Sequence, residues 1–193
     1  MRAVIQRVSS ASVAVDGDVI AQISRGLMVL RTQISTEDTD ADAAALTNKI
    51  LSLRVFADPE DEAKMWKTSV KDIDAEVLCV SQFTLMAQTK KGSKPDFHNA
   101  MKTEDSRVLY SKFLDCMRAA YKSNKIRDGR FGAMMNVSLT NEGPVTFTLD
   151  TREVVPAASG GANSKQSRPN KQLEHASSGA TSSQSPDKDG SAT

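Results

Sequence analysis

Aromatic side chains stop at Phe147, although the chain continues to residue 193. The last 40 residues consist largely of Ser, Gly, Ala, Asn, Gln and Pro with scattered charges. A segment of that composition buries too little apolar surface to offset the entropy lost on ordering. We therefore predict one folded domain at residues 1–153 and a disordered tail at residues 154–193.

Charge and hydropathy narrow the class of protein further. The tail carries four basic and three acidic residues, which leaves a neutral domain with 21 of each. Such a domain gives no electrostatic reason to expect DNA as a partner. Because no apolar run reaches the roughly 18 residues of a membrane span, we expect no membrane association. The N-terminus lacks the apolar block of a secretory signal, so we expect a cytoplasmic protein.

Short alternating or apolar runs predict the strands. MRAVIQRV, ASVAV and DVIAQI come first, and Asp16-Gly17 before the last of them is a strong hairpin signal. GLMVL and AEVLCVSQFTL predict buried strands, since their centres are continuous and apolar. Asn141 and Gly143 are turn formers between two strand-like runs, so NEGP predicts a final hairpin.

Two helices are predicted between these strands. Ser35 or Thr36 opens the first, whose apolar stripe consists of Ala43, Leu46, Ile50 and Leu53. Thr103 opens the second, whose apolar face consists of Val108, Leu109, Phe113, Cys116, Met117 and Ala120. The order, roughly βββαββαββ, predicts an α/β domain with a twisted, mainly antiparallel sheet or barrel that carries two helices.

The common catalytic motifs are missing. His98 is the single histidine of the domain, and no GxSxG elbow accompanies it. The sequence has no CxxC, HxE or HExxH, so we expect neither a metal site nor another cofactor. Cys79 lies within VLCV, where a small buried side chain is the better interpretation. Any catalysis is therefore expected to use main-chain groups, hydroxyls or the substrate itself.

Two segments carry polar residues that a structural role does not fully explain. SQFTL at residues 81–85 ends an apolar strand, and NEGPVT at residues 141–146 contains a proline where a strand should begin. Together they resemble the SQFTL and NxGPxT motifs of the D-aminoacyl-tRNA deacylases. The similarity runs in order through GLMVL, KGSKPDFH and DGRFGAMM, and it covers residues 1–150 but not the tail.

The resemblance implies a reaction and an assembly. These enzymes hydrolyse the ester that joins a D-amino acid, or glycine, to the terminal adenosine of tRNA, so the partner is the acceptor end of an aminoacyl-tRNA. Gly143 and Pro144 match a Gly-cisPro element that reaches into the active site of the partner subunit in a homodimer. There its carbonyl groups hold the amino group of the substrate and exclude an L side chain. Arg7 is expected to brace this element.

The resemblance places the reaction centre at SQFTL. Backbone N–H groups near Gln82 and Phe83 are expected to surround the developing oxyanion. The rings of Phe83 and Phe131 are expected to lie against the adenosine. Water is expected to attack with help from the ribose 2′-OH, while Ser81 and Thr84 are expected to organise the pocket.

Two basic clusters are expected to contact tRNA phosphates weakly. They consist of Lys90, Lys91 and Lys94, and of Lys122, Lys125, Arg127 and Arg130. One junction departs from the family. After GLMVL the family usually continues with a short, Gly-containing strand end, whereas this chain has Arg31, Thr32 and Gln33.

Two alternatives remain at this stage. One is an RNA-binding or scaffolding protein without catalysis on this fold. The other is an unrelated esterase that uses Thr84 or Cys79 as a covalent nucleophile. The intact pair of motifs favours the deacylase over both.

Overall fold

The computed structural model describes residues 1–32, 38–89, 92–97 and 102–152. The predicted tail and His98 lie outside the described residues, as do Ser35 and Thr36. The predicted start of the first helix is nevertheless wrong, because this helix begins at Asp40 with Thr39 as its N-cap. The elements, in chain order, are β1 Arg2–Val15, β2 Asp18–Ile23, β3 Gly26–Thr32, α1 Asp40–Ser52, β4 Glu76–Gln82, the 3₁₀ helix η1 Phe83–Met86, α2 Thr103–Ala120, the 3₁₀ helix η2 Ser123–Lys125, β5 Ile126–Asp128 and β6 Asn136–Asp150.

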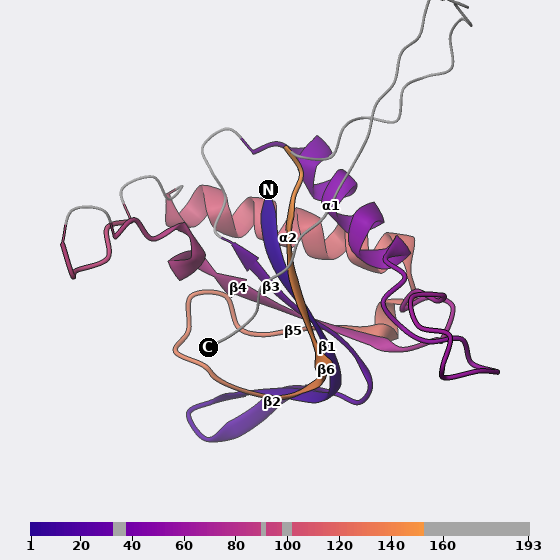
Figure 1. Cartoon of the computed structure of the whole chain (residues 1–193). Coiled ribbons are helices and arrows are strands. Elements are labelled where there is room, and N and C mark those ends of the chain that lie inside the picture. The colour runs from indigo at the N-terminus through magenta and orange to yellow at the C-terminus, as the bar shows by residue number, and fades with distance from the viewer. Residues whose placement is uncertain (33–37, 90–91, 98–101, 153–193) are drawn as a thin grey trace, which may run out of the picture. The chain divides into compact units, whose positions relative to one another are not determined.

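The long strand β1 organises a mixed, nearly barrel-shaped sheet. β1 pairs antiparallel with β2, β3 and β6, whereas β3 pairs with β4, and β4 with β5, in parallel. Figure 1 shows β1 and β6 side by side, with both helices on one side of the sheet. The predicted fold of a largely antiparallel sheet with two helices is confirmed.

The hairpin between β1 and β2 forms where the sequence predicts it. Asp16 and Gly17 both have positive φ, 54° and 95°, and the strands pair directly on either side. Two turn residues with positive φ match the right-handed twist of the strands. This turn therefore fixes the register of the first two strands.

The predicted hairpin at NEGP is wrong. Both halves of β6 pair with β1, so the chain keeps its direction through the motif. Val8 pairs with Asn141 and Gln6 with Thr146, so the four residues between them leave the ladder as a protrusion. The side-chain amide of Asn141 donates hydrogen bonds to the main-chain oxygens of Arg7 (2.8 Å) and Val145 (3.1 Å), which closes the protrusion at its base.

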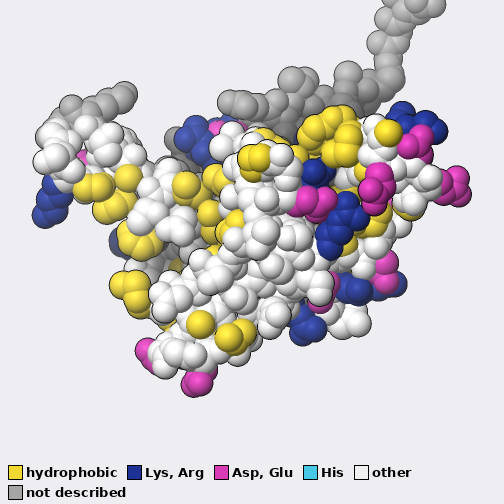
Figure 2. Space-filling view, turned by 60° about the horizontal axis from the view of Figure 1, so that its bottom comes forward, with side chains coloured by type: hydrophobic (Ala, Val, Ile, Leu, Met, Phe, Trp, Pro, Cys, Tyr) yellow, Lys and Arg dark blue, Asp and Glu magenta, His cyan; other side chains and the backbone are white. Residues whose placement is uncertain are grey.

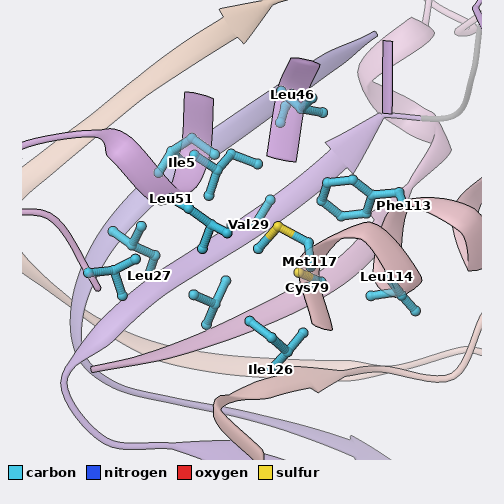
Figure 3. Close-up of a cluster of buried hydrophobic side chains, with 14 of the residues drawn as sticks. Ile5, Leu27, Val29, Leu46, Leu51, Cys79, Phe113, Leu114, Met117 and Ile126 are labelled. Carbon is cyan, nitrogen blue, oxygen red and sulfur yellow. The ribbon is translucent and has the colours of Figure 1, made fainter. Parts of the chain in front are cut away.

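The helices cover an apolar face of the sheet (Figure 3). The side chains of Ile5, Leu27, Val29 and Cys79 on the strands pack with side chains from both helices. The helical members of this cluster include Leu46, Leu51, Phe113, Leu114 and Met117. One predicted core position is wrong: Val108 is 58% exposed, because α2 turns Leu109 toward the sheet instead. None of the described helices is long and apolar enough to cross a membrane.

Candidate active site

A cavity opens where β4 ends. Arg31 on β3 pairs with Ser81 on β4, and the chain turns into η1 after Gln82. The cavity has a volume of about 290 Å³. Its lining residues are Arg31, Ser81, Gln82, Phe83, Thr103, Ser106, Tyr110, Phe131 and Gly132. Three residues of SQFTL and Phe131, although distant in sequence, therefore lie around one pocket.

Aromatic rings form much of the wall of this pocket. The Phe83 side chain is 50% exposed, and its ring packs edge-to-face with that of Phe97 at a centroid distance of 5.2 Å. Main-chain hydrogen bonds between Gln88 and Asp96 bring Phe97 to this position. The Phe131 ring lies 5.7 Å from that of Tyr110. The mouth thus offers exposed ring surface, on which a nucleobase stacks well.

Neither candidate nucleophile is activated in the described structure. Thr84 is exposed, and its hydroxyl oxygen accepts a hydrogen bond from the side-chain amide of Gln82. Cys79 is fully buried, and burial raises the pKa of its thiol to about 12. A thiol with that pKa is almost wholly protonated near neutral pH, and the protonated form is a poor nucleophile. Cys79 is therefore a core residue.

Arg31 and Tyr110 are pocket residues that the sequence did not predict. Arg31 is 1% exposed, and its Nη2 donates a hydrogen bond to Met1 Sδ at 3.2 Å. Its guanidinium carbon lies 5.6 Å from the ring centroid of Tyr110 and 4.9 Å from that of Phe113. Burial lowers the pKa of Arg31 to about 10, so it remains a cation at neutral pH. The only sequence signal was a charged residue directly after an apolar strand.

The protrusion of β6 presents Gly143 and Pro144 at the surface. The peptide bond between them is cis, and Gly143 has a φ of 113°. Thr146 Oγ1 donates a hydrogen bond to Asn141 Oδ1 at 2.9 Å, so the first and last residues of the NxGPxT motif hold its base closed. Gly143 and Pro144 are both exposed.

Two arginines fix the protrusion from its own chain. Arg7 is 5% exposed, donates from Nη1 to the main-chain oxygen of Val55 at 2.6 Å, and lies 3.8 Å from a Glu142 carboxylate oxygen. Arg25 donates two hydrogen bonds to the same carboxylate, at 3.0 and 3.2 Å. A methyl group added to Gly143 would lie 3.0 Å from Arg7 Nη2, so Arg7 packs directly against the Gly-Pro unit.

The pocket and the protrusion lie at different levels of the sheet. Arg7, beside the protrusion, pairs with Leu27, whereas Arg31, in the pocket wall, pairs with Ala3 and Ser81. The four residue-to-residue steps from Leu27 to Arg31 correspond to about 13 Å of strand. Within one chain, the Gly-Pro unit is not among the described residues that line the pocket.

Basic side chains form no continuous surface on the face that Figure 2 presents, where acidic and basic side chains are intermingled. In the second basic cluster, Lys122 and Lys125 lie 2.9 and 3.9 Å from the Asp74 carboxylate. Lys90 and Lys91 of the first cluster lie outside the described residues. Within the part that is described, no group of three or more His, Cys, Asp or Glu residues is arranged to hold a metal ion.

Comparison with known proteins identifies the family. The family described as D-Tyr-tRNA(Tyr) deacylase matches residues 4–150. The chain belongs to this deacylase family. The resemblance inferred from SQFTL and NEGPVT is thereby confirmed, and the chain is a hydrolase of the D-aminoacyl-tRNA deacylase type.

Individual relatives match about four fifths of this chain and nearly all of their own length. A D-aminoacyl-tRNA deacylase of Candida glabrata is 55% identical over 153 residues, which are 79% of this chain and 100% of that protein. The deacylase of Drosophila melanogaster is 50% identical over 79% of this chain and 94% of its own.

Two solved structures have the same fold. One is named c-Myc DNA Unwinding Element Binding Protein, with a TM-score of 0.73 and 49% identity over 78% of this chain and 99% of that one. The other is a probable eukaryotic D-amino acid tRNA deacylase, with a TM-score of 0.67 over 77% of this chain and 97% of that one. At 20% identity, the second likeness shows the fold alone.

Proposed function

We propose that this deacylase releases D-amino acids, and glycine, from tRNA in the cytoplasm, and that two copies of the chain build each active site. In this proposal the pocket at Ser81–Phe83 of one subunit binds the terminal adenosine and the ester. Gly143 and Pro144 of the other subunit close that pocket and contact the amino group of the substrate. Family membership supports the deacylation itself.

The single observation that carries the assembly is the placement of Gly143 and Pro144. Their base is held by the Asn141–Thr146 hydrogen bond and by Arg7, yet their tip is exposed and does not line the pocket of the same chain. A rigid, exposed main-chain unit is suited to entering a site on another subunit. In a symmetric dimer the same contact then forms twice.

The pocket supports hydrolysis by water rather than by a protein nucleophile. The Thr84 hydroxyl accepts a hydrogen bond from the Gln82 amide, and no acidic or basic side chain of the described residues hydrogen-bonds to it. An unassisted hydroxyl reacts slowly near neutral pH. In the proposed mechanism the ribose 2′-OH of the substrate assists the attacking water. Backbone N–H groups near Gln82 and Phe83 stabilise the negative charge that develops on the ester oxygen.

Selection by a main-chain unit explains how one site could accept many D-amino acids. A pocket that selected side chains by apolar contact would gain about 1–3 kcal/mol per methylene, so it would need a different shape for each residue. A rigid Gly-Pro unit instead clashes with the first carbon of an L side chain, whatever follows that carbon. Glycine lacks this carbon, so glycyl-tRNA is expected to be hydrolysed as well.

The proposal is tested by following ester loss from matched D-aminoacyl-, L-aminoacyl- and glycyl-tRNA. The D-forms and the glycyl form should be hydrolysed and the L-forms spared. A substrate with a 2′-deoxy terminal adenosine should be inert, whereas Thr84→Ala should retain substantial activity. Comparable hydrolysis of L-forms would refute the selectivity. A trapped Thr84 acyl-enzyme, or full activity on the 2′-deoxy substrate, would refute the mechanism.

A binding protein without catalysis is the less favoured alternative. The name of one structural neighbour refers to DNA binding by that protein. The domain of the present chain has no net charge, and attraction to phosphates is the main source of affinity for nucleic acids. Ester hydrolysis by the purified chain would exclude this alternative directly.

A further inference from the structure

Two buried polar groups of the pocket wall have no hydrogen-bond partner within the described part of the chain. Arg31 is 1% exposed and Tyr110 is 4% exposed, and both line the cavity. Neither Nε of Arg31 nor the hydroxyl of Tyr110 makes a hydrogen bond to any residue that the structure describes. A buried polar group without a partner costs about 1–3 kcal/mol, so these two call for an explanation.

The positive charge of Arg31 is also poorly compensated. Among the described residues, Asp38 is the carboxylate whose charge favours the Arg31 cation, but it is paired at 2.8 Å with the N-terminal amino group. The nearest compensation comes from the faces of the Tyr110 and Phe113 rings. A buried, unpaired charge lowers stability. Its presence in a pocket wall indicates a ligand that supplies the missing acceptor.

The remaining lining residues define the chemistry of that ligand. Thr103 and Ser106 belong to the first turn of the long helix α2, the electropositive end of a helix. No carboxylate is among the described lining residues, while Phe83, Tyr110 and Phe131 contribute aromatic rings. The pocket therefore combines flat apolar walls with hydrogen-bond donors, which suits a planar heterocycle rich in acceptor nitrogens better than a free anion.

We propose that Arg31 and Tyr110 recognise ring nitrogens of the terminal adenine, which makes Arg31 a specificity-determining residue of this chain. This inference rests on the proposed function, since that function brings the acceptor end of tRNA to the pocket. Adenine offers the acceptor nitrogens N1, N3 and N7, and an arginine or a phenol can donate to any of them. Stacking on Phe83 and Phe131 holds the base, and the two donors fix its orientation.

The test combines base analogues with protein variants. D-aminoacyl-tRNAs that end in 1-deaza-, 3-deaza- or 7-deazaadenosine each lack one acceptor nitrogen. With the wild-type protein, at least one analogue should lower kcat/KM about tenfold, the effect of one lost hydrogen bond to a charged donor. In Arg31→Met or Tyr110→Phe that penalty should disappear, while kcat/KM on the natural substrate falls. Arg54→Met, which removes an exposed arginine outside this pocket, should keep the full penalty.

Measuring the stability of the variants distinguishes a role of Arg31 in adenine recognition from a purely structural role. Arg31→Met replaces a buried cation that forms no ion pair with a described residue by an apolar side chain, so its urea midpoint should equal or exceed that of the wild type. A structural arginine would give a lower midpoint and leave the analogue penalties unchanged. Tyr110→Phe removes a hydroxyl that bonds to no described group, so it should fold as well as the wild type.

Binding of AMP and its three deaza analogues, measured by NMR titration, keeps this inference separate from catalysis. If no ester is hydrolysed but the analogue penalty appears in binding and disappears in Arg31→Met, the proposed function fails and the recognition stands. If all three analogues behave like adenosine with the wild type, or if the penalties persist in both variants, the recognition by Arg31 and Tyr110 is wrong.

Discussion

The SQF pocket (the cavity at Ser81–Phe83) and the Gly-Pro protrusion (Glu142–Val145) are built in opposite ways. The pocket forms where β3, β4, α2 and Phe131 meet, and two of its buried polar groups, Arg31 Nε and the Tyr110 hydroxyl, have no hydrogen-bond partner among the described residues. The protrusion is a local departure from one strand, and its polar groups are paired at the base while its tip is exposed. The pocket therefore offers hydrogen-bond donors to a ligand, and the protrusion offers an exposed main-chain surface for contact.

This difference indicates why the chain needs both regions. A pocket made by long-range packing can bind a base and stabilise charge. Its walls are side chains, however, and side chains can move to fit either stereoisomer. A short main-chain unit fixed by two arginines can reject a stereoisomer without adapting. In the proposed dimer, combining the two regions across subunits would separate binding from selection.

The largest effect is expected from the tip of the protrusion. Gly143 has a φ of 113°, and a methyl group there would lie 2.9 Å from Val145 Cγ2 and 3.0 Å from Arg7 Nη2. Gly143→Ala should displace the tip and lower kcat/KM on D-aminoacyl-tRNA by about 10²-fold. Gly17→Ala is the matched control, because Gly17 also has positive φ but its added methyl group would contact nothing within 4 Å. Gly17→Ala should lose stability but not specific activity. Equal specific activities of the two variants would show that the tip of the protrusion has no special role in activity.

A similar loss of activity is expected from a substitution in the SQF pocket. Phe83 begins the 3₁₀ helix η1, a position that accepts proline. Phe83→Pro removes one backbone N–H and the ring, and loss of an oxyanion donor should lower kcat by about 10²–10³-fold. Phe83→Leu keeps the N–H and loses only stacking, so it should cost roughly tenfold, mainly in KM. If both variants behave alike, the backbone N–H of Phe83 has no catalytic role.

Cys79→Ala should affect folding rather than chemistry. Cys79 packs with both helices in the core cluster, so the substitution should lower the free energy of unfolding by about 1–2 kcal/mol. The turnover of the folded fraction should not change, since the thiol is buried and protonated. Urea denaturation followed by assays on the folded protein measures both quantities. A variant that is stable but inactive would instead support the alternative hypothesis of an esterase with Cys79 as covalent nucleophile.

The smallest effect concerns the cap of α1. Hydrogen bonds from Thr151 and Thr39 lower the pKa of Asp42 from 3.8 to about 2. The unfolded chain thus binds the proton more tightly, so the stabilisation is present above pH 4 and is lost as pH falls toward 2. Asp42→Asn should cost about 1 kcal/mol at neutral pH, because the cap is partly exposed, and should flatten the acid limb of the stability curve. An unchanged acid limb would show that Asp42 contributes nothing to acid stability.

The correct predictions rest on signals that lie within a few consecutive residues. Asp16-Gly17 specifies its hairpin through the φ angles of two residues, and VLCV marks a buried strand by its composition alone. The hairpin prediction at NEGP was wrong because Asn and Gly suit a hairpin and a protrusion equally. Only the pairing of both flanks with β1 decides between the two, and that pairing depends on a strand more than 100 residues earlier.

The pocket was predictable only in part, for the same reason. Ser81, Gln82 and Phe83 carry a recognisable motif, so their grouping was expected. Arg31 looked like an altered strand end, because a charged residue is seldom fully buried. Its burial depends on the rings of Tyr110 and Phe113, which α2 supplies from about 80 residues further along the chain. No local pattern encodes that contact.

Subunit mixing tests the central claim most directly. Gly143→Ala has a damaged protrusion and an intact pocket, while Phe83→Pro has the reverse, so each homodimer should be inactive. When the two are unfolded and refolded together in equal amounts, half of the dimers should be mixed, and each of these has one intact site. The account predicts recovery of about a quarter of the wild-type activity on D-aminoacyl-tRNA. Activity no higher than the average of the two separate variants, or an active monomer in light scattering, would contradict it.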